Sequence, residues 1–279
     1  MIHEIAPHCF DNQYIKSSPN SESIALYFEE NLSLVKKTSQ GIEFPKFKEL
    51  EPFSEDIYQD AIYLFAIDKQ TYFLVTDLDV EKSSEYTMEK VEDFRKGPSL
   101  KESFTGLTAY QLFRWYENNQ FCGKCATILE HDEKERMLRC NKCKQMIYPR
   151  LNPAVIVGVT HKDKILLSRY NGQAEGTYAL VAGYVEVGEP LEDAVKREVL
   201  EEVGLHVTNI RYYTSQPWPF TDSLLIGFYC DVVDFNEDIV LDKEELSLAQ
   251  WFEREDIPVK PNNISLTNEM IVQFKNGEV

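Results

Sequence analysis

The sequence lacks three features, and each absence excludes a class of protein. It has no apolar run near the length of about 20 residues that spans a bilayer, so we expect no transmembrane helix. Residues 1–7 lack a basic segment followed by an apolar core, so we expect no secretory signal and a cytoplasmic location. Basic residues are scarce: 29 Lys and Arg stand against 47 Asp and Glu, for a net charge of −18. This balance argues against broad, nonspecific binding to nucleic acid or to an anionic membrane.

The remaining composition is typical of a soluble globular protein. Hydrophobic residues make up 43% and charged residues 27% of the chain. Its 279 residues suffice for one or two domains with a buried core. The negative net charge still permits a local basic site for a phosphorylated ligand.

The first 98 residues carry no motif that indicates chemistry. Residues 61–67 and 71–76 are apolar and are separated by Asp68-Lys-Gln70, which predicts a β-hairpin. We therefore expect a small mixed, mostly β N-terminal domain over residues 1–98. Apolar residues recur at roughly helical spacing in residues 99–120, which predicts a connecting helix packed on a neighbouring element.

Four of the six cysteines stand in two pairs with the spacing of metal ligands. Cys122-Gly-Lys-Cys125 and Cys140-Asn-Lys-Cys143 are separated by 14 residues. Four thiolates so spaced can close a tetrahedron around Zn²⁺, with Zn–S distances of about 2.3 Å. Disulfides are the alternative, and the expected cytosolic location disfavours them. We therefore expect a zinc ribbon over residues 121–150 whose Zn²⁺ supports folding rather than catalysis. Cys9 and Cys230 stand alone and are expected to be free thiols.

The most informative segment spans residues 183–205. Pro190 suits the start of a helix, and Gly204 suits the left-handed residue just past its end. A helix of roughly four turns is expected between them. Valines at every fourth position, Val195, Val199 and Val203, give this helix an apolar stripe.

Three glutamates of this segment are expected to share one patch of the helix. Glu198, Glu201 and Glu202 stand at i, i+3 and i+4, so their carboxylates lie close together. Arg197 precedes Glu201 by four residues and can orient it or partly neutralise it. Such a patch is unfavourable alone and becomes favourable around a hard divalent cation, which prefers oxygen ligands. The alternative is an ordinary solvated acidic helix face.

The complete pattern of residues 183–205 resembles the Nudix box. A glycine is followed by five residues, a glutamate, seven residues, Arg-Glu, an aliphatic, one residue, Glu-Glu, one residue, Gly and an aliphatic. Nudix hydrolases cleave a nucleoside diphosphate linked to another moiety, and the glutamates of their box hold Mg²⁺ or Mn²⁺. The resemblance implies an α/β fold, with a Nudix α/β/α sandwich over residues 151–279. Apolar strand patterns such as residues 153–160 and 164–169 agree with a mixed sheet between helices.

A third stretch, residues 215–223, places two prolines around a tryptophan with a second aromatic residue next. The prolines restrict the backbone, and a rigid aromatic surface suits stacking on a flat base or on nicotinamide. The alternative is a loop whose tryptophan fills the core. A zinc ribbon, a Nudix box and this stretch, in this order, resemble the NAD(H) pyrophosphatase branch of the Nudix hydrolases. Thr221 departs from that branch, which usually has a further proline there.

The resemblance implies an activity, its cations and its site residues. It implies hydrolysis of the pyrophosphate of NADH and NAD⁺ to nicotinamide mononucleotide and AMP, and removal of NAD caps from RNA 5′ ends, by a homodimer. It implies Mg²⁺ or Mn²⁺ ligation by Glu198, Glu202, Glu245 and the main-chain carbonyl of Ala182. Glu201 or Glu202 is expected to be the general base. The residues that match substrate-contacting positions are Tyr148, Gln216, Pro217, Trp218, Pro219, Phe220, Thr221, Asp222, Ser223 and Thr267, the last in place of the family's usual alanine.

Two other functions are compatible with the same motifs. One is a Nudix hydrolase of another nucleoside diphosphate derivative, such as ADP-ribose. The other is a Nudix-like domain that senses a ligand and regulates through the ribbon. Degenerate box glutamates would favour such a regulator, and here the glutamates are intact.

Overall fold

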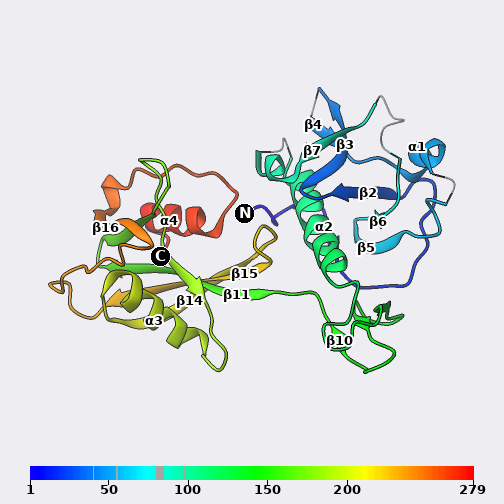
Figure 1. Ribbon diagram of the computed structural model, residues 1–279. Helices are drawn as coiled ribbons and strands as arrows, with labels where there is room; N and C mark the ends of the chain where they lie inside the picture. Colours follow the sequence, from blue (N-terminus) through cyan, green and yellow to red (C-terminus); the bar gives the residue numbers. More distant parts are fainter. Residues whose placement is uncertain (40, 55, 80–84, 97–98) are drawn as a thin grey trace. The chain divides into compact units, whose positions relative to one another are not determined.

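The computed structural model describes residues 1–39, 41–54, 56–79, 85–96 and 99–279 (Figure 1). The chain forms two compact units. The N-terminal unit is Ile2–Arg150, and the C-terminal unit is Leu151–Val279 with Met1. The N-terminal domain, the connecting helix and the ribbon expected from the sequence all lie in the first unit. The boundary expected after residue 98 falls at residues that lie outside the described ranges.

The N-terminal unit is built on a seven-stranded sheet with the order β1-β5-β6-β2-β3-β4, in which β7 also pairs with β3. Its β5 and β6 form the antiparallel hairpin expected from the sequence. The expected connecting helix is α2, and the Ser99 hydroxyl caps its start by accepting from the Glu102 N–H. The elements of this unit are β1 (Phe10–Asp11), β2 (Ile24–Glu29), β3 (Leu32–Thr38), β4 (Gly41–Glu43), α1 (Phe47–Leu50), β5 (Ile62–Ile67), β6 (Gln70–Val75), β7 (Thr87–Lys90), α2 (Leu100–Asn118), β8 (Glu130–His131), β9 (Leu138–Arg139) and β10 (Met146–Ile147).

The ribbon is a small three-stranded sheet with the order β10-β9-β8. Its β8 and β9 are antiparallel and lie between the two cysteine pairs in the sequence. Hydrogen bonds join the ribbon to the rest of its unit: the Tyr14 hydroxyl donates to the Asp132 carbonyl, and the Arg136 guanidinium donates to the Leu64 carbonyl. The ribbon is therefore part of a larger packed body.

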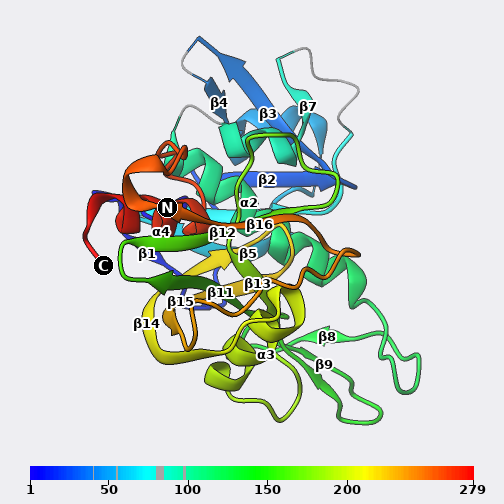
Figure 2. The ribbon, with the colours of Figure 1, turned by 90° about the vertical axis from the view of Figure 1, so that its left-hand side faces the viewer.

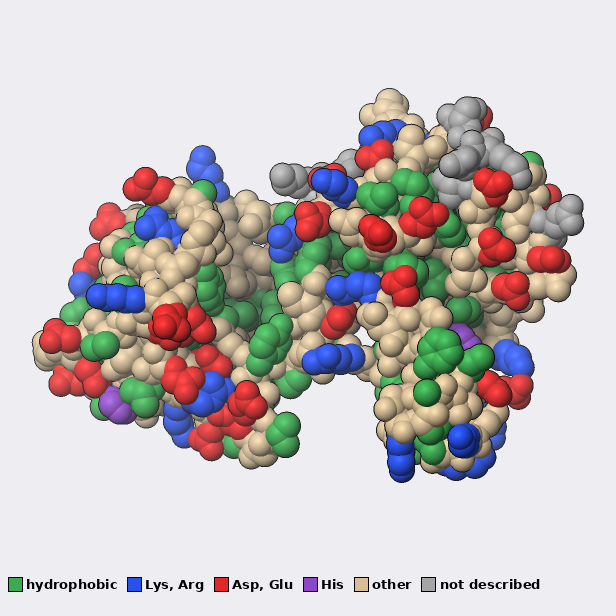
Figure 3. All heavy atoms as spheres, viewed as in Figure 1, with side chains coloured by type: hydrophobic (Ala, Val, Ile, Leu, Met, Phe, Trp, Pro, Cys, Tyr) green, Lys and Arg blue, Asp and Glu red, His purple; other side chains and the backbone are tan. Residues whose placement is uncertain are grey.

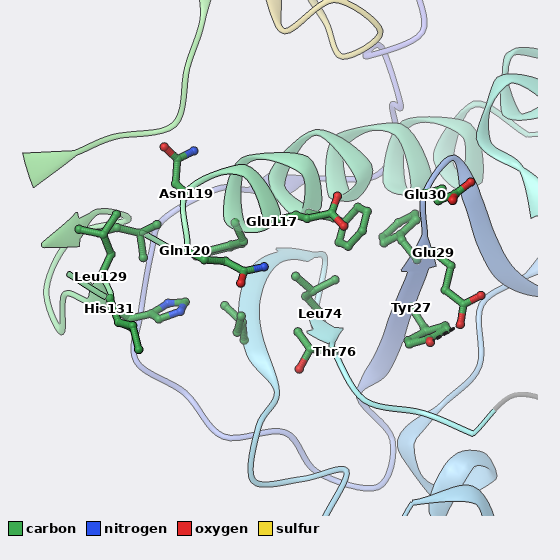
Figure 4. Close-up of a pocket in the computed structure, with 16 residues that line it drawn as sticks. Tyr27, Glu29, Glu30, Leu74, Thr76, Glu117, Asn119, Gln120, Leu129 and His131 are labelled. Carbon is green, nitrogen blue, oxygen red and sulfur yellow. Dashed lines mark hydrogen bonds between the residues drawn. The ribbon is translucent and has the colours of Figure 1, made fainter. Parts of the chain in front are cut away.

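A hollow of about 640 Å³ lies in the N-terminal unit between the end of α2, the ribbon, β2 and β6 (Figure 4). Glu29, Glu30 and Glu117 line it, together with Tyr27 and His131. Among the described residues that line it there is no Lys or Arg. Its charge therefore opposes a pyrophosphate anion, and this hollow does not suit a dinucleotide.

Acidic side chains are also spread over the face of the molecule drawn in Figure 3, as the net charge of −18 leads one to expect.

The C-terminal unit contains a six-stranded mixed sheet with the order β14-β15-β11-β12-β16, in which β13 pairs with β11. Strands β11 and β15 are parallel, and the other pairs are antiparallel. The elements of this unit are β11 (Asn152–His161), β12 (Lys164–Tyr170), β13 (Val181–Tyr184), α3 (Leu191–Val203), β14 (Val207–Trp218), β15 (Ser223–Val232), β16 (Leu246–Glu253) and α4 (Leu266–Asn276).

Two helices cover opposite faces of this sheet, α3 on one side and α4 on the other (Figure 2). The side chains of β11 alternate between the two resulting cores. Val155 and Val157 pack in the core that contains Val199 of α3, whereas Ile156 packs in the core that contains Met270 of α4. The expected α/β/α sandwich is confirmed. In the described part of the chain, no helix has both the length and the apolar character needed to cross a membrane.

Residues 215–218 belong to a strand and not to the loop that was the alternative for this stretch, because β14 continues through Trp218 and pairs with the start of β15. β14 is an edge strand of the sheet. Proline has no backbone N–H to donate to a neighbouring strand, and edge strands are where sheets tolerate it. The turn between β14 and β15 is therefore short, and it contains Phe220 and Thr221.

Candidate active site

The box helix α3 ends as the sequence predicts. Gly204 has φ +72°, the left-handed conformation of a C-cap, and its N–H donates to the Leu200 carbonyl. Pro190 is the N-cap residue, in an extended conformation, directly before the first helical residue. The apolar stripe of the helix is buried, and Glu198 and Glu202 lie on the same buried side. Their burial follows from their position beside this stripe.

Arg197 ties the loop before the helix to the helix itself. Its guanidinium donates to both carboxylate oxygens of Glu189, at 2.8 and 2.9 Å, and to the Tyr184 carbonyl at 2.9 Å. It also donates to Glu198 at 2.7 Å and to Glu201 at 3.0 Å. This bidentate contact lowers the pKa of Glu189 to about 2. Arg197 therefore orients the glutamate patch, as its spacing predicted.

Glu202 is the most deeply buried glutamate of the patch. Its side chain is 2% exposed, and its Oε1 accepts from the Ala182 N–H at 3.4 Å. Its Oε2 is buried and has no hydrogen-bond partner among the described residues. Burial, reinforced by the charges of Glu198 and Glu245, raises the pKa of Glu202 to about 8. A buried carboxylate oxygen without a partner is costly unless a cation meets it.

Gly183 makes room for Glu198. A Cβ built on Gly183 would collide with the carboxylate of Glu198, so this carboxylate lies directly over the glycine. Burial raises the pKa of Glu198, and the neighbouring Arg197 opposes that shift. The unpartnered oxygen of Glu202 is the kind of ligand atom that a divalent cation prefers. This function of Gly183 is not apparent from its place in the box pattern.

We expect Gly183→Ala to lower the rate of NADH hydrolysis by on the order of 100-fold, because the new methyl group displaces the Glu198 carboxylate. The measurement is steady-state turnover at saturating Mn²⁺. Gly123→Ala is the matched control, because a Cβ at that position meets nothing within 4 Å. Equal rates for the two variants would contradict the role given to Gly183.

Glu245 lies in a turn before β16 and is exposed. The negative charge of Glu245 disfavours the ionised forms of Glu198 and Glu202 and so raises the pKa of both. The three glutamates nevertheless do not form a compact ligand set in the structure. Within the described ranges, the four ribbon cysteines are the one group of three or more side chains placed closely enough to hold a metal ion.

The ribbon cysteines form a metal-type cluster. Their sulfur atoms all lie within 4.8 Å of one another, and the Cys122–Cys143 and Cys125–Cys140 sulfur pairs are each 3.5 Å apart. A zinc tetrahedron with bonds of about 2.3 Å places its sulfurs roughly 3.8 Å apart, so the cluster has nearly the required size. None of the six cysteines, all of them described, forms a disulfide.

The aromatic residues after the box lie together at the end of β14. The rings of Trp218 and Phe220 are 5.0 Å apart and tilted by 57°, and both side chains are half-buried. Pro219 between them is buried. Thr221 is exposed, and its hydroxyl lies 2.8 Å from that of Ser223, which is buried. The two rings, rather than Ser223, therefore offer surface to a planar ligand.

Three other residues predicted to contact the substrate are buried, half-buried or part of the N-terminal unit. Gln216 is fully buried: its amide donates to the Ile264 carbonyl at 2.7 Å and accepts from the Leu266 N–H at 2.6 Å. Both of its polar atoms thus link β14 to the start of α4, where Thr267 lies half-buried. Tyr148 belongs to the N-terminal unit, where its hydroxyl donates to Glu135 at 2.7 Å. The sequence pattern gave no sign that both polar atoms of the Gln216 side chain form internal hydrogen bonds.

Comparison with known families agrees with the geometry of the C-terminal unit. Residues 150–272 match the NUDIX domain, so the fold of this part of the chain is that of a Nudix domain. Residues 117–148 match the NADH pyrophosphatase zinc ribbon domain. The chain thus contains a Nudix domain and an NADH pyrophosphatase-type zinc ribbon, as its sequence motifs predicted.

Curated relatives carry a common name. The chain is 42% identical over 151 residues to the NAD-capped RNA hydrolase NudC of Klebsiella pneumoniae, covering 54% of this chain and 58% of that protein. It is 41% identical over 163 residues to the NAD-capped RNA hydrolase NudC of Pseudomonas aeruginosa, covering 58% of each. The matched part is thus little more than half the length of these relatives. The crystal structure of a NUDIX hydrolase from Nitrosomonas europaea is similar with a TM-score of 0.48 and 22% identity, covering 57% of this chain and 92% of that one.

Proposed function

We propose that this chain is a metal-dependent hydrolase that cleaves the pyrophosphate of NADH and NAD⁺ into nicotinamide mononucleotide and AMP. We extend the proposal to the removal of NAD caps from RNA 5′ ends, the activity for which its curated relatives are named. The observation that carries the proposal is the buried, unpartnered oxygen of Glu202 beside the carboxylate of Glu198. Two buried carboxylates close together are costly unless a cation neutralises them or one of them is protonated.

The proposed site holds its cation through carboxylates. Glu198 and Glu202, with Glu245 and the carbonyl of Ala182, are the proposed ligands of Mg²⁺ or Mn²⁺. When bound, such an ion neutralises the pyrophosphate and activates a water molecule. Water attacks one phosphorus atom, and the bridging oxygen leaves with the other phosphate. Glu201 or Glu202 accepts the proton of the water.

Other parts of the chain supply orientation. Arg197 holds Glu201 by a hydrogen bond of 3.0 Å and thereby orients its carboxylate. Trp218 and Phe220 are proposed to stack on a flat ring of the substrate, because both rings are half-buried at the end of β14. The ribbon is proposed to bind Zn²⁺ without a part in the chemistry. The family resemblance further supports a homodimer in the cytoplasm.

Product analysis tests this function. The full-length protein is incubated with NADH, NAD⁺, ADP-ribose and an NAD-capped transcript at matched concentrations, with Mg²⁺ or Mn²⁺. We expect AMP and nicotinamide mononucleotide from the dinucleotides, a 5′-monophosphate on the RNA, and slower turnover of ADP-ribose. Intact NADH alongside rapid cleavage of ADP-ribose would instead identify a Nudix hydrolase with another substrate. Binding of the dinucleotides without any cleavage would identify a regulator.

A further inference from the structure

The segment that carries Glu245 is attached to the end of the box helix by its backbone. The Val240 N–H donates to the Val203 carbonyl at 3.0 Å, and the Asp242 N–H donates to the Glu202 carbonyl at 2.9 Å. Gly204 permits this close approach, because a Cβ on it would lie 2.9 Å from the Cβ of Val240. Residues 240–242 are thereby fixed to α3, but these contacts end before Glu245.

Asn171 holds the remainder of the segment. It directly follows β12, and its backbone N–H donates to the Glu245 carbonyl at 2.8 Å. Its side-chain amide donates to the carbonyls of Lys243 at 3.0 Å and Glu244 at 2.9 Å. One residue therefore binds three successive carbonyls of the turn. Its side chain is exposed, so the apolar core does not account for its place.

This clamp opposes an electrostatic repulsion. The charge of Glu245 acts on the buried carboxylates of Glu198 and Glu202, since it raises the pKa of both, and like charges repel. The turn is closed internally by the Glu245 N–H, which donates to the Asp242 carbonyl at 3.3 Å, and Asn171 fixes this turn to β12. A clamp made from a neighbouring strand keeps the turn in place before a cation arrives, which lowers the cost of binding the cation.

We propose that Asn171 is a positioning residue for the divalent cation: its amide clamps residues 243–245 so that Glu245 can join Glu198 and Glu202 when the cation binds. The inference rests on the proposed function, in which these glutamates bind Mg²⁺ or Mn²⁺. Asn171 itself contacts neither the cation nor the substrate. Groups that orient the ligands of a metal ion typically change its affinity roughly 10- to 100-fold when they are removed.

The test is the affinity of the full-length protein for Mn²⁺ alone, measured from the electron paramagnetic resonance signal of free Mn²⁺. We expect Asn171→Ala to weaken Mn²⁺ binding about tenfold. The melting temperature without Mn²⁺ is expected to change little, because the backbone hydrogen bond to Glu245 remains. At saturating Mn²⁺, the turnover of NADH is expected to return towards the parent value, since no catalytic group has been removed.

Asn268→Ala is the matched control. The Asn268 amide donates to the Lys260 carbonyl at 2.9 Å, so the change removes the same kind of bond elsewhere in the unit. We expect it to leave the affinity for Mn²⁺ unchanged. If Asn268→Ala weakened Mn²⁺ binding as much as Asn171→Ala, the effect would be a general loosening of the unit and the inference would be wrong.

A double-mutant cycle separates this inference from the function on which it rests. If Asn171 acts through Glu245, then Asn171→Ala has no further effect on Mn²⁺ affinity once Glu245→Gln is present. Additive losses, or a loss with Glu245→Gln but none with Asn171→Ala, would refute the role of Asn171 and leave the proposed function standing. No loss with either Glu245→Gln or Glu202→Gln would refute the proposed cation site itself.

Discussion

Glu202→Gln lowers the hydrolysis of NADH by roughly two to four orders of magnitude, the usual effect of removing a group that transfers a proton or holds a catalytic cation. The change keeps the size of the side chain and removes its charge. It therefore removes the attraction of the buried Oε2 for a cation while it leaves the packing against the valines of α3 intact. The measurement is kcat and KM at several Mn²⁺ concentrations, with AMP as the detected product.

Two other glutamates of α3 serve as comparisons. Glu192 is exposed in the first turn of the same helix, so Glu192→Gln is the matched control and is expected to retain the parent rate. Glu201→Gln identifies the general base. A deeper loss than with Glu202→Gln, at unchanged Mn²⁺ affinity, would assign the proton transfer to Glu201. A Glu202→Gln variant with the parent rate would remove the basis of the proposed mechanism.

Glu202→Gln, which is expected to lower turnover, is also expected to raise the folding stability of the metal-free protein. The pKa of Glu202 rises from its ordinary value of 4.5 to about 8 in the folded chain, because burial disfavours the charged form. The folded state therefore binds more protons than the unfolded state between these two values. Stability is then lost as the pH rises from 4.5 to about 8, and Glu202→Gln removes this loss.

The expected result is a higher melting temperature for metal-free Glu202→Gln than for the parent at pH 8, with the difference shrinking as the pH falls towards 4.5. Mn²⁺ should stabilise the parent and have little effect on the variant. A variant that is less stable than the parent at every pH would mean that the charge of Glu202 is compensated within the protein. A residue that costs stability and supports turnover is a common feature of active sites.

Local features of the site could be predicted from the sequence because they depend on residues close together in the chain. The ends of α3 follow from Pro190 and Gly204, and the contact of Arg197 with Glu201 follows from helical spacing. The two cysteine pairs predicted the metal-type cluster in the same way, since each pair lies within one short turn.

Features that depend on distant residues could not be predicted in this way. The space over Gly183 is filled by Glu198, which arrives from the next element along the chain. Gln216 resembles a ligand contact within its motif, and only the start of α4 shows that both of its polar atoms are used. Asn171 belongs to no motif at all. Its importance depends on a turn that lies more than seventy positions later in the chain.

Cys140→Ala abolishes zinc binding and unfolds the ribbon. Cys140 is fully buried, and its sulfur is 3.5 Å from that of Cys125, so its loss opens the four-sulfur cluster. Structural zinc sites in small domains contribute on the order of 10 kcal/mol, which the three short strands of the ribbon cannot replace. We expect no bound zinc, rapid proteolysis within residues 126–139, and a lower melting temperature. The measurements are metal analysis, limited proteolysis and thermal unfolding.

Cys230→Ala is the matched control, because it also removes a fully buried thiol but lies in β15, away from the cluster. It is expected to keep one zinc ion per chain. The damage from Cys140→Ala should reach the strands that contact the ribbon, since Arg136 donates to the Leu64 carbonyl of β5. The Mn²⁺ affinity of the C-terminal unit should remain, because Glu198 and Glu202 lie on α3 and not in the ribbon. Loss of Mn²⁺ binding together with zinc would show that the ribbon maintains the glutamate site, and its role would then exceed the folding of its own unit.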